Sequence, residues 1–223
     1  MTWWIADLLQ SNPALLVSWV VWVIGSIVLH ELAHGWAAIA QGDRTPIETG
    51  HMTWNPLVHM GGLSLLMFAV VGIAWGQMPV NPGRFRSRYG DAIVSFAGPA
   101  MNLALALLSC LLAALWIDYA AAVSQPLQGN VRTFFVAGAF LNLVLCLFNL
   151  LPVPPLDGSR ILASLSPAYR AVLSGPNAGT ISLVAFMLVF MVAGKFVFPI
   201  GRDTAWAVIH FFQALLPGGP PPP

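Results

Sequence analysis

The sequence predicts an all-α polytopic membrane protein. Of its 223 residues, 58% are hydrophobic and only 8% are charged, whereas soluble domains average about 25% charged residues. The mean hydropathy is +0.79, and apolar runs approaching or exceeding the ~20 residues that a spanning helix needs recur along the chain. The net charge of +1 gives no indication of nucleic-acid binding.

We expect about five transmembrane helices. The first follows the helix-start signal Asn12-Pro13. The expected spans are residues 14–40, 92–117, 131–151 and 180–200 and a shorter helix over 204–216. A short helix over 159–165 and a loop over 167–177 connect the third and fourth spans. No Lys or Arg precedes the first apolar run, so the sequence predicts no cleavable secretion signal.

Two segments between the first two spans are too short or too polar to cross a membrane. Residues 61–76 are apolar but few, which favours a re-entrant or interfacial segment. Residues 44–59 are polar and are bounded by Pro46 and Pro56. They are interpreted as a short β-hairpin or extended edge at the membrane surface, able to pair with a substrate backbone, or as a plain surface loop.

The apolar chain as a whole is expected to form one membrane-embedded domain, residues 1–216. The Pro/Gly tail, 217–223, has no means of packing and is expected to be disordered. Cys110 and Cys146 lie in apolar runs and are interpreted as small packing residues.

The motif His30-Glu31-Leu32-Ala33-His34 lies in the second half of the first span. Residues four apart share one face of a helix, so both imidazoles can bind a single metal ion. Glu31 can take a proton from a metal-bound water, which is the arrangement of zinc hydrolases. Ionisable groups in the hydrocarbon region cost roughly 2.5–3.5 kcal/mol each, so such a cluster indicates a functional site.

Asp157 is the candidate third ligand. It follows a run in which Pro152, Pro154 and Pro155 forbid a regular helix, and irregular backbone at membrane depth is tolerated where it lines a cavity. A catalytic zinc takes three protein ligands and keeps one open position. His30, His34 and Asp157 supply that number, for one Zn²⁺ per chain.

Two further polar side chains are candidates for the cavity. Asn102 lies some ten residues into the second span, where its amide either faces the metal cavity or bonds a neighbouring helix. His59 precedes Gly61-Gly62 and is considered as a gate or an extra ligand.

The ligands meet at one depth only if the spans 14–40 and 131–151 run in the same direction, which requires that 61–76 does not cross the membrane. One membrane face then holds six Arg residues and the other holds three Lys and Arg residues. By the positive-inside rule the N-terminus is extracytoplasmic and the metal lies nearer the cytoplasmic face.

Three sequence blocks together resemble the site-2 intramembrane metalloproteases. They are the His30–His34 motif, Gly98-Pro99-x-x-Asn102, and Asn149-x-x-Pro-x-Pro-x-x-Asp157-Gly158. The order of the blocks is that of the family, and the likeness is greatest to its compact bacterial branch without PDZ or CBS modules. The resemblance implies zinc on His30, His34 and Asp157, water activation by Glu31, and a role for Asn149 in holding the substrate or its oxyanion.

The function that we expect is zinc-dependent cleavage of transmembrane segments of membrane proteins, in a bacterial inner membrane. The expected partners are therefore a transmembrane protein or peptide substrate and the lipid bilayer. The alternatives are a non-cleaving relative that binds membrane segments, a metal transporter, and a protease acting on soluble peptides or prenylated tails. The oligomeric state and the substrate's identity do not follow from the sequence.

Overall fold

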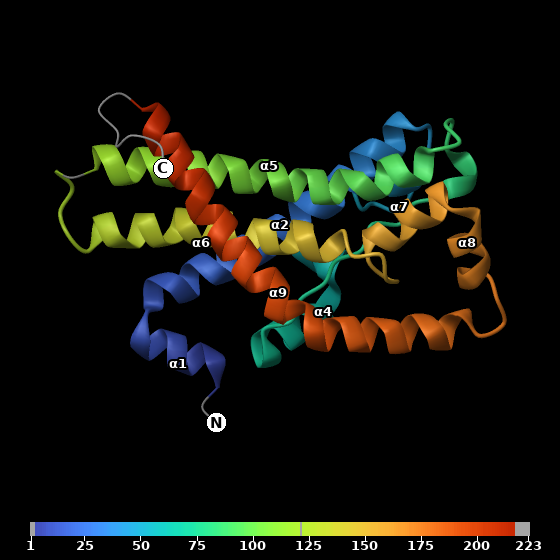
Figure 1. Cartoon of the computed structure of the whole chain (residues 1–223), viewed down its shortest axis with the longest axis horizontal. Coiled ribbons are helices and arrows are strands. Elements are labelled where there is room, and N and C mark those ends of the chain that lie inside the picture. Colours follow the sequence, from blue (N-terminus) through green and yellow to red (C-terminus); the bar gives the residue numbers. More distant parts are fainter. Residues whose placement is uncertain (1–2, 121, 217–223) are drawn as a thin grey trace.

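Four long apolar helices dominate the computed structural model, which describes residues 3–120 and 122–216 (Figure 1). They are α2 (Pro13–Ala40), α5 (Gly90–Tyr119), α6 (Leu127–Asn149) and α9 (Ala178–Leu215), and each is long and apolar enough to cross a membrane. The shorter elements are α1 (Trp4–Ser11), α3 (Thr45–Glu48), α4 (Pro56–Val71), the 3₁₀ turn η1 (Pro82–Arg84), α7 (Asp157–Leu165) and α8 (Pro167–Leu173). The chain is an integral membrane protein, with four candidate spans in its described part where five were expected. The predicted tail, 217–223, lies outside the described residues.

The helices α5 and α6 form the centre of the bundle, because they pack against each other and both pack against α2 and α9. In Figure 1, α5 and α6 run side by side along the long axis, and α9 crosses α6. Small side chains fill the contact between α5, α6 and α9, among them Ala106, Ala113, Ala139 and Ala205. Small residues let helix backbones approach closely, which is how apolar helices associate where water does not drive packing.

Proline and a capping side chain start several helices. Asn12 caps α2 by accepting a hydrogen bond from the Leu15 backbone N–H at 3.0 Å, with Pro13 in the first turn. The predicted start of the first span is thus confirmed to within one residue. Ser166 and Pro167 start α8 in the same way. The prediction of a loop over 167–177 was therefore wrong for 167–173, where this start signal was overlooked.

The predicted break between spans over 180–200 and 204–216 does not exist. A single helix, α9, continues through Pro199 and Gly201. Gly201 lies inside the predicted break, but it is buried against α6, where an added Cβ would lie 2.9 Å from a methyl group of Val144. Tertiary packing therefore carries the helix through, and Figure 1 shows α9 changing direction along its length, as expected for an internal proline.

The predicted hairpin or extended edge over 44–59 was also wrong. The segment holds the short helix α3 and turns, and no residue of it is in a strand. Pro46 lies in the first turn of α3, and Asn55 caps α4, which begins at Pro56. Local hydrogen bonds close these turns, such as that from the Glu48 N–H to the Arg44 carbonyl at 2.9 Å. The prolines that were read as strand boundaries are helix starts.

The apolar segment 61–76 forms most of α4 and then turns back on itself. Gly72 ends α4 in the left-handed conformation, at φ +83°, which favours glycine. The Ser64 hydroxyl donates to the carbonyl of Trp75 and accepts from its N–H, and the N–H of Gln77 bonds the carbonyl of His59 at 2.9 Å. The non-helical segment 73–81 therefore returns alongside α4 to the point where the helix began.

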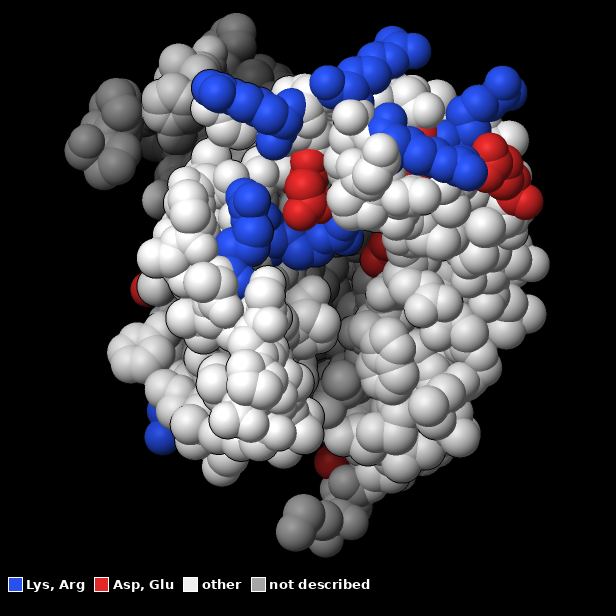
Figure 2. Space-filling model, turned by 90° about the vertical axis from the view of Figure 1, so that its right-hand side faces the viewer, with Lys and Arg blue, Asp and Glu red and all other residues white. Residues whose placement is uncertain are grey.

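The chain between α2 and α5 begins and ends at one end of the bundle. The N–H of Arg86 bonds the carbonyl of Gln41 at 2.9 Å, so α5 starts beside the end of α2 and runs antiparallel to it. Figure 2 views the end of the molecule that carries α7 and α8, and shows Lys and Arg side chains gathered in its upper part, above a hollow. This is the arrangement of chain ends that a non-spanning 61–76 requires.

Candidate metal centre

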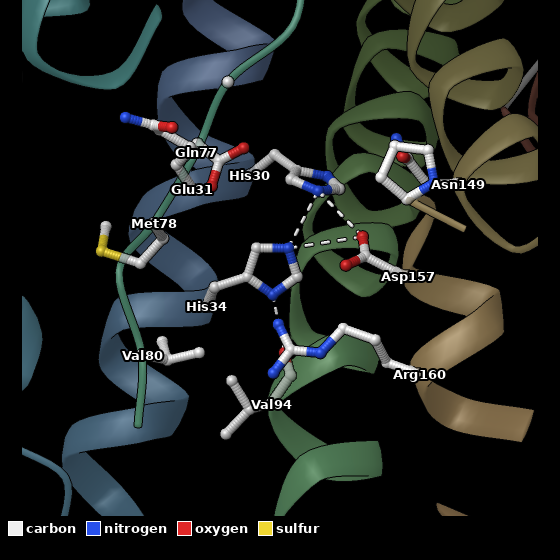
Figure 3. A pocket seen from close by; sticks show the side chains of 12 residues that line it. His30, Glu31, His34, Gln77, Met78, Val80, Val94, Asn149, Asp157 and Arg160 are labelled. Atoms are coloured by element: carbon white, nitrogen blue, oxygen red, sulfur yellow. Dashed lines mark hydrogen bonds and ion pairs between the residues drawn. The ribbon is translucent and has the colours of Figure 1, made fainter. Parts of the chain in front are cut away.

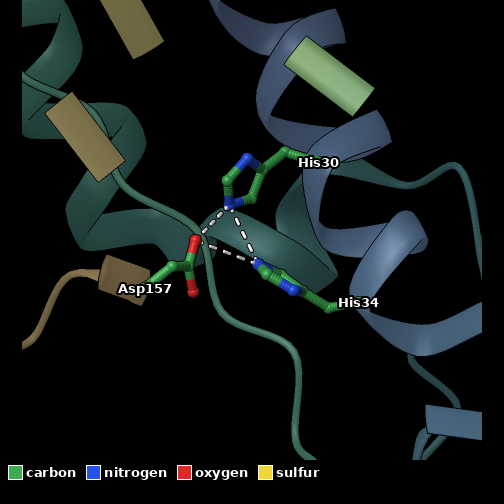
Figure 4. Close-up of side chains that lie close together, drawn as sticks. All are labelled: His30, His34 and Asp157. Carbon is green, nitrogen blue, oxygen red and sulfur yellow. Dashed lines mark hydrogen bonds and ion pairs between the residues drawn. The ribbon is translucent and has the colours of Figure 1, made fainter. Parts of the chain in front are cut away.

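Three side chains converge at the end of the bundle described above. His30 and His34 lie one turn apart on α2, and Asp157 is the first residue of α7, directly after the irregular segment that follows α6 (Figure 4). The two Nε2 atoms are 3.0 Å apart, and Asp157 Oδ2 lies 3.1 Å from His30 Nε2 and 3.3 Å from His34 Nε2. The sequence prediction that these three residues meet is confirmed.

The geometry of the three atoms fits a zinc ion. Tetrahedral ligands at zinc bond lengths of about 2.0–2.1 Å lie about 3.3 Å from one another, and the three measured separations are 3.0–3.3 Å. Among the residues described, this is the group of His, Cys, Asp and Glu side chains whose ligand atoms lie close enough to hold a metal. Two imidazoles and one carboxylate are a zinc donor set with an open fourth position.

Each imidazole is oriented by a hydrogen bond from its other nitrogen. His30 Nδ1 donates to the side-chain Oδ1 of Asn102 at 2.6 Å, and His34 Nδ1 donates to the backbone carbonyl of Val94 at 2.7 Å. Both acceptors belong to α5. Because each Nδ1 carries the proton, each Nε2 keeps its lone pair and points it at the shared centre. The centre is therefore a convergence of three electron-pair donors, which a cation satisfies.

The centre opens into a cavity of about 290 Å³ between α2, α6, α7 and the segment 73–81 (Figure 3). Glu31 and Asn149 line this cavity together with the three candidate ligands. Glu31 is buried, with 7% of its surface exposed. The Asn149 amide donates one hydrogen bond to the carbonyl of Leu145 at 3.0 Å, and its second N–H remains for another acceptor. The other lining residues are Gly76, Gln77, Met78, Val80, Val94, Pro155 and Arg160.

Three glycines allow the backbone to approach the centre closely. An added Cβ at Gly98 of α5 would lie 2.5 Å from His30 ring atoms, and one at Gly76 would lie 2.6 Å from the Glu31 carboxylate. An added Cβ at Gly158 would collide with the carbonyl of Leu150. Gly158 therefore lets α7 start directly beneath the end of α6, which brings Asp157 to the histidines.

The buried carboxylate of Asp43 anchors the cavity-lining segment to the end of α2. It accepts hydrogen bonds from the Asn81 N–H at 2.6 Å and from the N–H and hydroxyl of Thr45. Burial alone would raise the pKa of Asp43, but these hydrogen bonds and the nearby Arg84 outweigh it and hold the pKa below its usual value. A second link joins α7 to α5, where Arg160 donates to Asp91 at 2.7 Å.

The two further candidates for the cavity, Asn102 and His59, both lie outside its lining. Asn102 was expected either to face the metal cavity or to bond a neighbouring helix. It bonds two neighbouring helices, since its Oδ1 accepts from His30 of α2 and its amide nitrogen donates to Asn142 of α6, and it is not among the cavity-lining residues. His59 is fully buried, but its Nε2 bonds the carbonyl of Thr53 at 2.7 Å and it is not among the cavity-lining residues.

Sequence reasoning missed Asn142, Gly76 and Arg160. The argument that singled out Asn102, an amide inside an apolar helix, applies equally to Asn142. By contrast, the sequence around Gly76 and Arg160 carries no comparable signal, because their positions depend on how the chain folds back.

A membrane protein with a two-His, one-Asp centre and a neighbouring Glu, built on a His-Glu-x-x-His helix, is a zinc metalloprotease by class. Residues 18–194 match the family model of Peptidase family M50, the site-2 proteases. This chain belongs to that family.

Similar proteins in other organisms have names of the same kind. The chain is 34% identical over 194 residues to "Putative zinc metalloprotease YwhC" of Bacillus subtilis (strain 168), which covers 86% of this chain and 85% of that protein. It is 34% identical over 155 residues to "Putative zinc metalloprotease Rip2" of Mycobacterium tuberculosis (67% of this chain, 56% of that protein). It is 26% identical over 170 residues to "Putative zinc metalloprotease MJ0611" of Methanocaldococcus jannaschii (75% and 78%). No solved structure matches the chain.

Proposed function

We propose that this chain is an intramembrane endopeptidase that holds one zinc per molecule and cleaves transmembrane segments of membrane proteins, in the manner of regulated intramembrane proteolysis. The proposal rests on the location of the metal centre within a candidate membrane-spanning helix. His30, Glu31 and His34 are buried in a helix long and apolar enough to span the bilayer. Polar groups at that depth are costly, roughly 2.5–3.5 kcal/mol for a charged group, and are kept for function.

The residues around the centre divide the chemistry between them. His30, His34 and Asp157 hold the zinc, which when bound supplies a Lewis acid that acidifies water and polarises a peptide carbonyl. The Glu31 carboxylate accepts a proton from the attacking water and delivers it to the nitrogen of the leaving amine. The free N–H of Asn149 donates to the oxyanion that develops on the substrate carbonyl.

A transmembrane substrate has to unwind before it is cut, because a helix engages its own carbonyls in hydrogen bonds. The segment from Gly76 to Val80 lines the cavity, and its Gln77, Met78 and Val80 lie across the cavity from Asn149 (Figure 3). We assign to this non-helical segment the substrate-holding role that the sequence suggested for 44–59. The polypeptide between these two walls is then held beside Glu31.

The membrane placement follows from the chain ends and the charges. Residues 41 and 86 lie together at one end of the bundle, so α4 and 73–81 together enter and leave the membrane from one side. Arg residues cluster in the connections at that end, which by the positive-inside rule is the cytoplasmic side. The host membrane is a bacterial inner membrane, and the metal centre lies nearer its cytoplasmic face.

The test is co-expression of the chain with candidate single-span membrane proteins. Wild type should yield a cleaved product, and Glu31→Gln should yield none while still binding zinc, because the base is lost and the ligands remain. Glu48→Gln, at an exposed carboxylate outside the cavity, is the matched control and should cleave like wild type. Equal product from wild type and Glu31→Gln would reject the mechanism.

The same preparations distinguish the alternative functions. Zinc flux into liposomes would indicate a transporter. Stable capture of a single-span protein by wild type without any product would indicate a binding protein. Cleavage of soluble or prenylated peptides, but of no membrane-spanning protein, would place the substrate outside the bilayer.

A further inference from the structure

A chain of three buried polar side chains connects the metal centre to the middle of the bundle. His30 of α2 donates to Asn102 of α5 at 2.6 Å, and Asn102 Nδ2 donates to Asn142 Oδ1 of α6 at 3.0 Å. Asn142 Nδ2 in turn donates to the backbone carbonyl of Gly138 at 3.0 Å. Asn102 and Asn142 both have no exposed surface.

The final acceptor, the backbone carbonyl of Gly138, sets the direction of every hydrogen bond in this series. The Gly138 carbonyl can only accept, so Asn142 must turn its NH₂ toward it and its oxygen toward Asn102. Asn102 must then give its NH₂ to Asn142 and its oxygen to His30. An oxygen facing His30 Nδ1 requires that this nitrogen carry the proton. The lone pair of His30 is then on Nε2, the atom that faces Asp157.

We propose that Asn142 is a positioning residue for the metal centre, which fixes the Nδ1–H tautomer and the ring orientation of His30 through Asn102. This inference rests on the proposed role of His30 as a zinc ligand. Asn142 touches neither the centre nor the cavity, so its influence passes through Asn102. The series begins at His30 on α2, passes through Asn102 on α5 and ends at Gly138 on α6. It therefore links these three helices at the depth of the metal centre.

The two ligand histidines differ in how they are controlled. His34 is oriented by the backbone carbonyl of Val94, which no side-chain substitution removes. His30 depends on two side-chain amides, and losing Asn142 leaves the Asn102 amide free to rotate. A rotated amide would present NH₂ to His30 Nδ1 and favour the other tautomer, with the proton on Nε2 in the place of the metal.

The proposal is tested by metal binding to the full-length chain in detergent. Zinc affinity is measured by competition with a chelator, and the ligand field is measured by the absorption of bound Co²⁺. Asn142→Leu, which has similar volume and no polar atoms, should weaken zinc binding about 10- to 100-fold, the usual effect of losing a group that orients a ligand. Cys146→Ala, at a buried residue one turn along α6, is the control and should bind zinc like wild type.

Two further variants separate positioning from helix packing. Asn142→Asp should retain most of the affinity, because a carboxyl group buried here stays protonated, donates to Gly138 and accepts from Asn102. If Asn142→Leu fails to fold, Asn142→Asp still tests the proposal, because a tenfold loss of zinc affinity in this variant would contradict it. Asn102→Leu combined with Asn142→Leu should bind zinc no more weakly than Asn102→Leu alone, since the second residue acts only through the first.

The outcomes are distinct. Wild-type zinc affinity in Asn142→Leu, with only its thermal stability lowered, would overturn the proposal and leave Asn142 as a helix-packing residue. An additive loss in the double variant would do the same. If wild type itself binds no zinc, the proposed function fails before Asn142 is at issue.

Discussion

Two glycines, Gly98 and Gly76, determine how closely the backbone approaches the candidate ligands and Glu31. Gly98 lies against the rings of His30 and His34, and Gly76 lies against Glu31. At both positions an added methyl group would come within about 2.6 Å of a functional side chain. The geometry of the metal centre thus depends on the lack of a side chain at Gly98 and Gly76 as well as on the donor groups.

We expect Gly98→Ala to impair zinc binding by at least tenfold, because the methyl group must displace the imidazoles from a geometry that ligands need. Gly25→Ala, on α2 where nothing lies within 4 Å of the added Cβ, is the matched control and should bind zinc like wild type. Chelator competition measures both. Unchanged affinity in Gly98→Ala would show that the helices separate enough to accommodate the methyl group.

At this scale the sequence predicted the ligands well and their supports poorly. His30, Glu31 and His34 carry their own spacing signal, and Asp157 follows a run of prolines. Asn142 stands alone in an apolar helix, and a single amide has no spacing that ties it to the motif. Only the packing of α5 against α6 reveals that it faces Asn102.

At the scale of the elements, the long helices were predictable because their length and apolar composition are set by the bilayer. The errors fell where proline and glycine have two meanings. Pro46, Pro56 and Pro167 start helices, and Gly201 packs against α6 rather than ending α9. Local pattern alone does not distinguish a glycine that breaks a helix from one that lets helices touch.

The connection between α2 and the cavity-lining segment should depend on Asp43. Asp43→Ala removes charged hydrogen bonds to Asn81 and Thr45, each worth about 1.5–3 kcal/mol. The net loss of one such bond would already make opening of the segment about 10- to 100-fold more frequent, so trypsin cleavage at Arg84, Arg86 and Arg88 should accelerate at least about tenfold. Asp7→Ala, at an exposed carboxylate, should leave the rate unchanged.

The same anchor should also respond to pH. The pKa of Asp43 is lower in the folded chain than its ordinary value of 3.8. Its stabilisation is therefore complete well above that value and declines as the pH falls through the lowered folded pKa. An acid-stable protease such as pepsin should cut 77–88 faster as the pH is lowered in wild type, and Asp43→Ala should lose this dependence. A pH dependence shared by both proteins would assign it to another group.

The whole molecule is organised by the direction of its spans. The ligands could meet only if α2 and α6 are parallel, and the structure confirms that the intervening 61–76 turns back to its starting end. This topology was predictable because a metal centre links positions far apart in sequence, which helix composition alone does not.

The orientation in the membrane is tested by cysteine accessibility. Ser87→Cys should react with an impermeant thiol reagent only from the cytoplasmic side, and Ser124→Cys, at the opposite end of α5, only from the outside. The native Cys110 and Cys146 are buried and give little background. Labelling of Ser87→Cys from the extracytoplasmic side alone would invert the proposed topology.

The separation of the donors along the chain also affects the order of biosynthesis. The histidines and Glu31 lie on the first long helix, whereas the carboxylate that completes the centre comes 127 residues after His30. While the ribosome is still making the chain, the early helix sits in the lipid with an incomplete set of donors. A peptidase assembled in this way stays inert among the other helices entering the bilayer until three of its four candidate spans have been made.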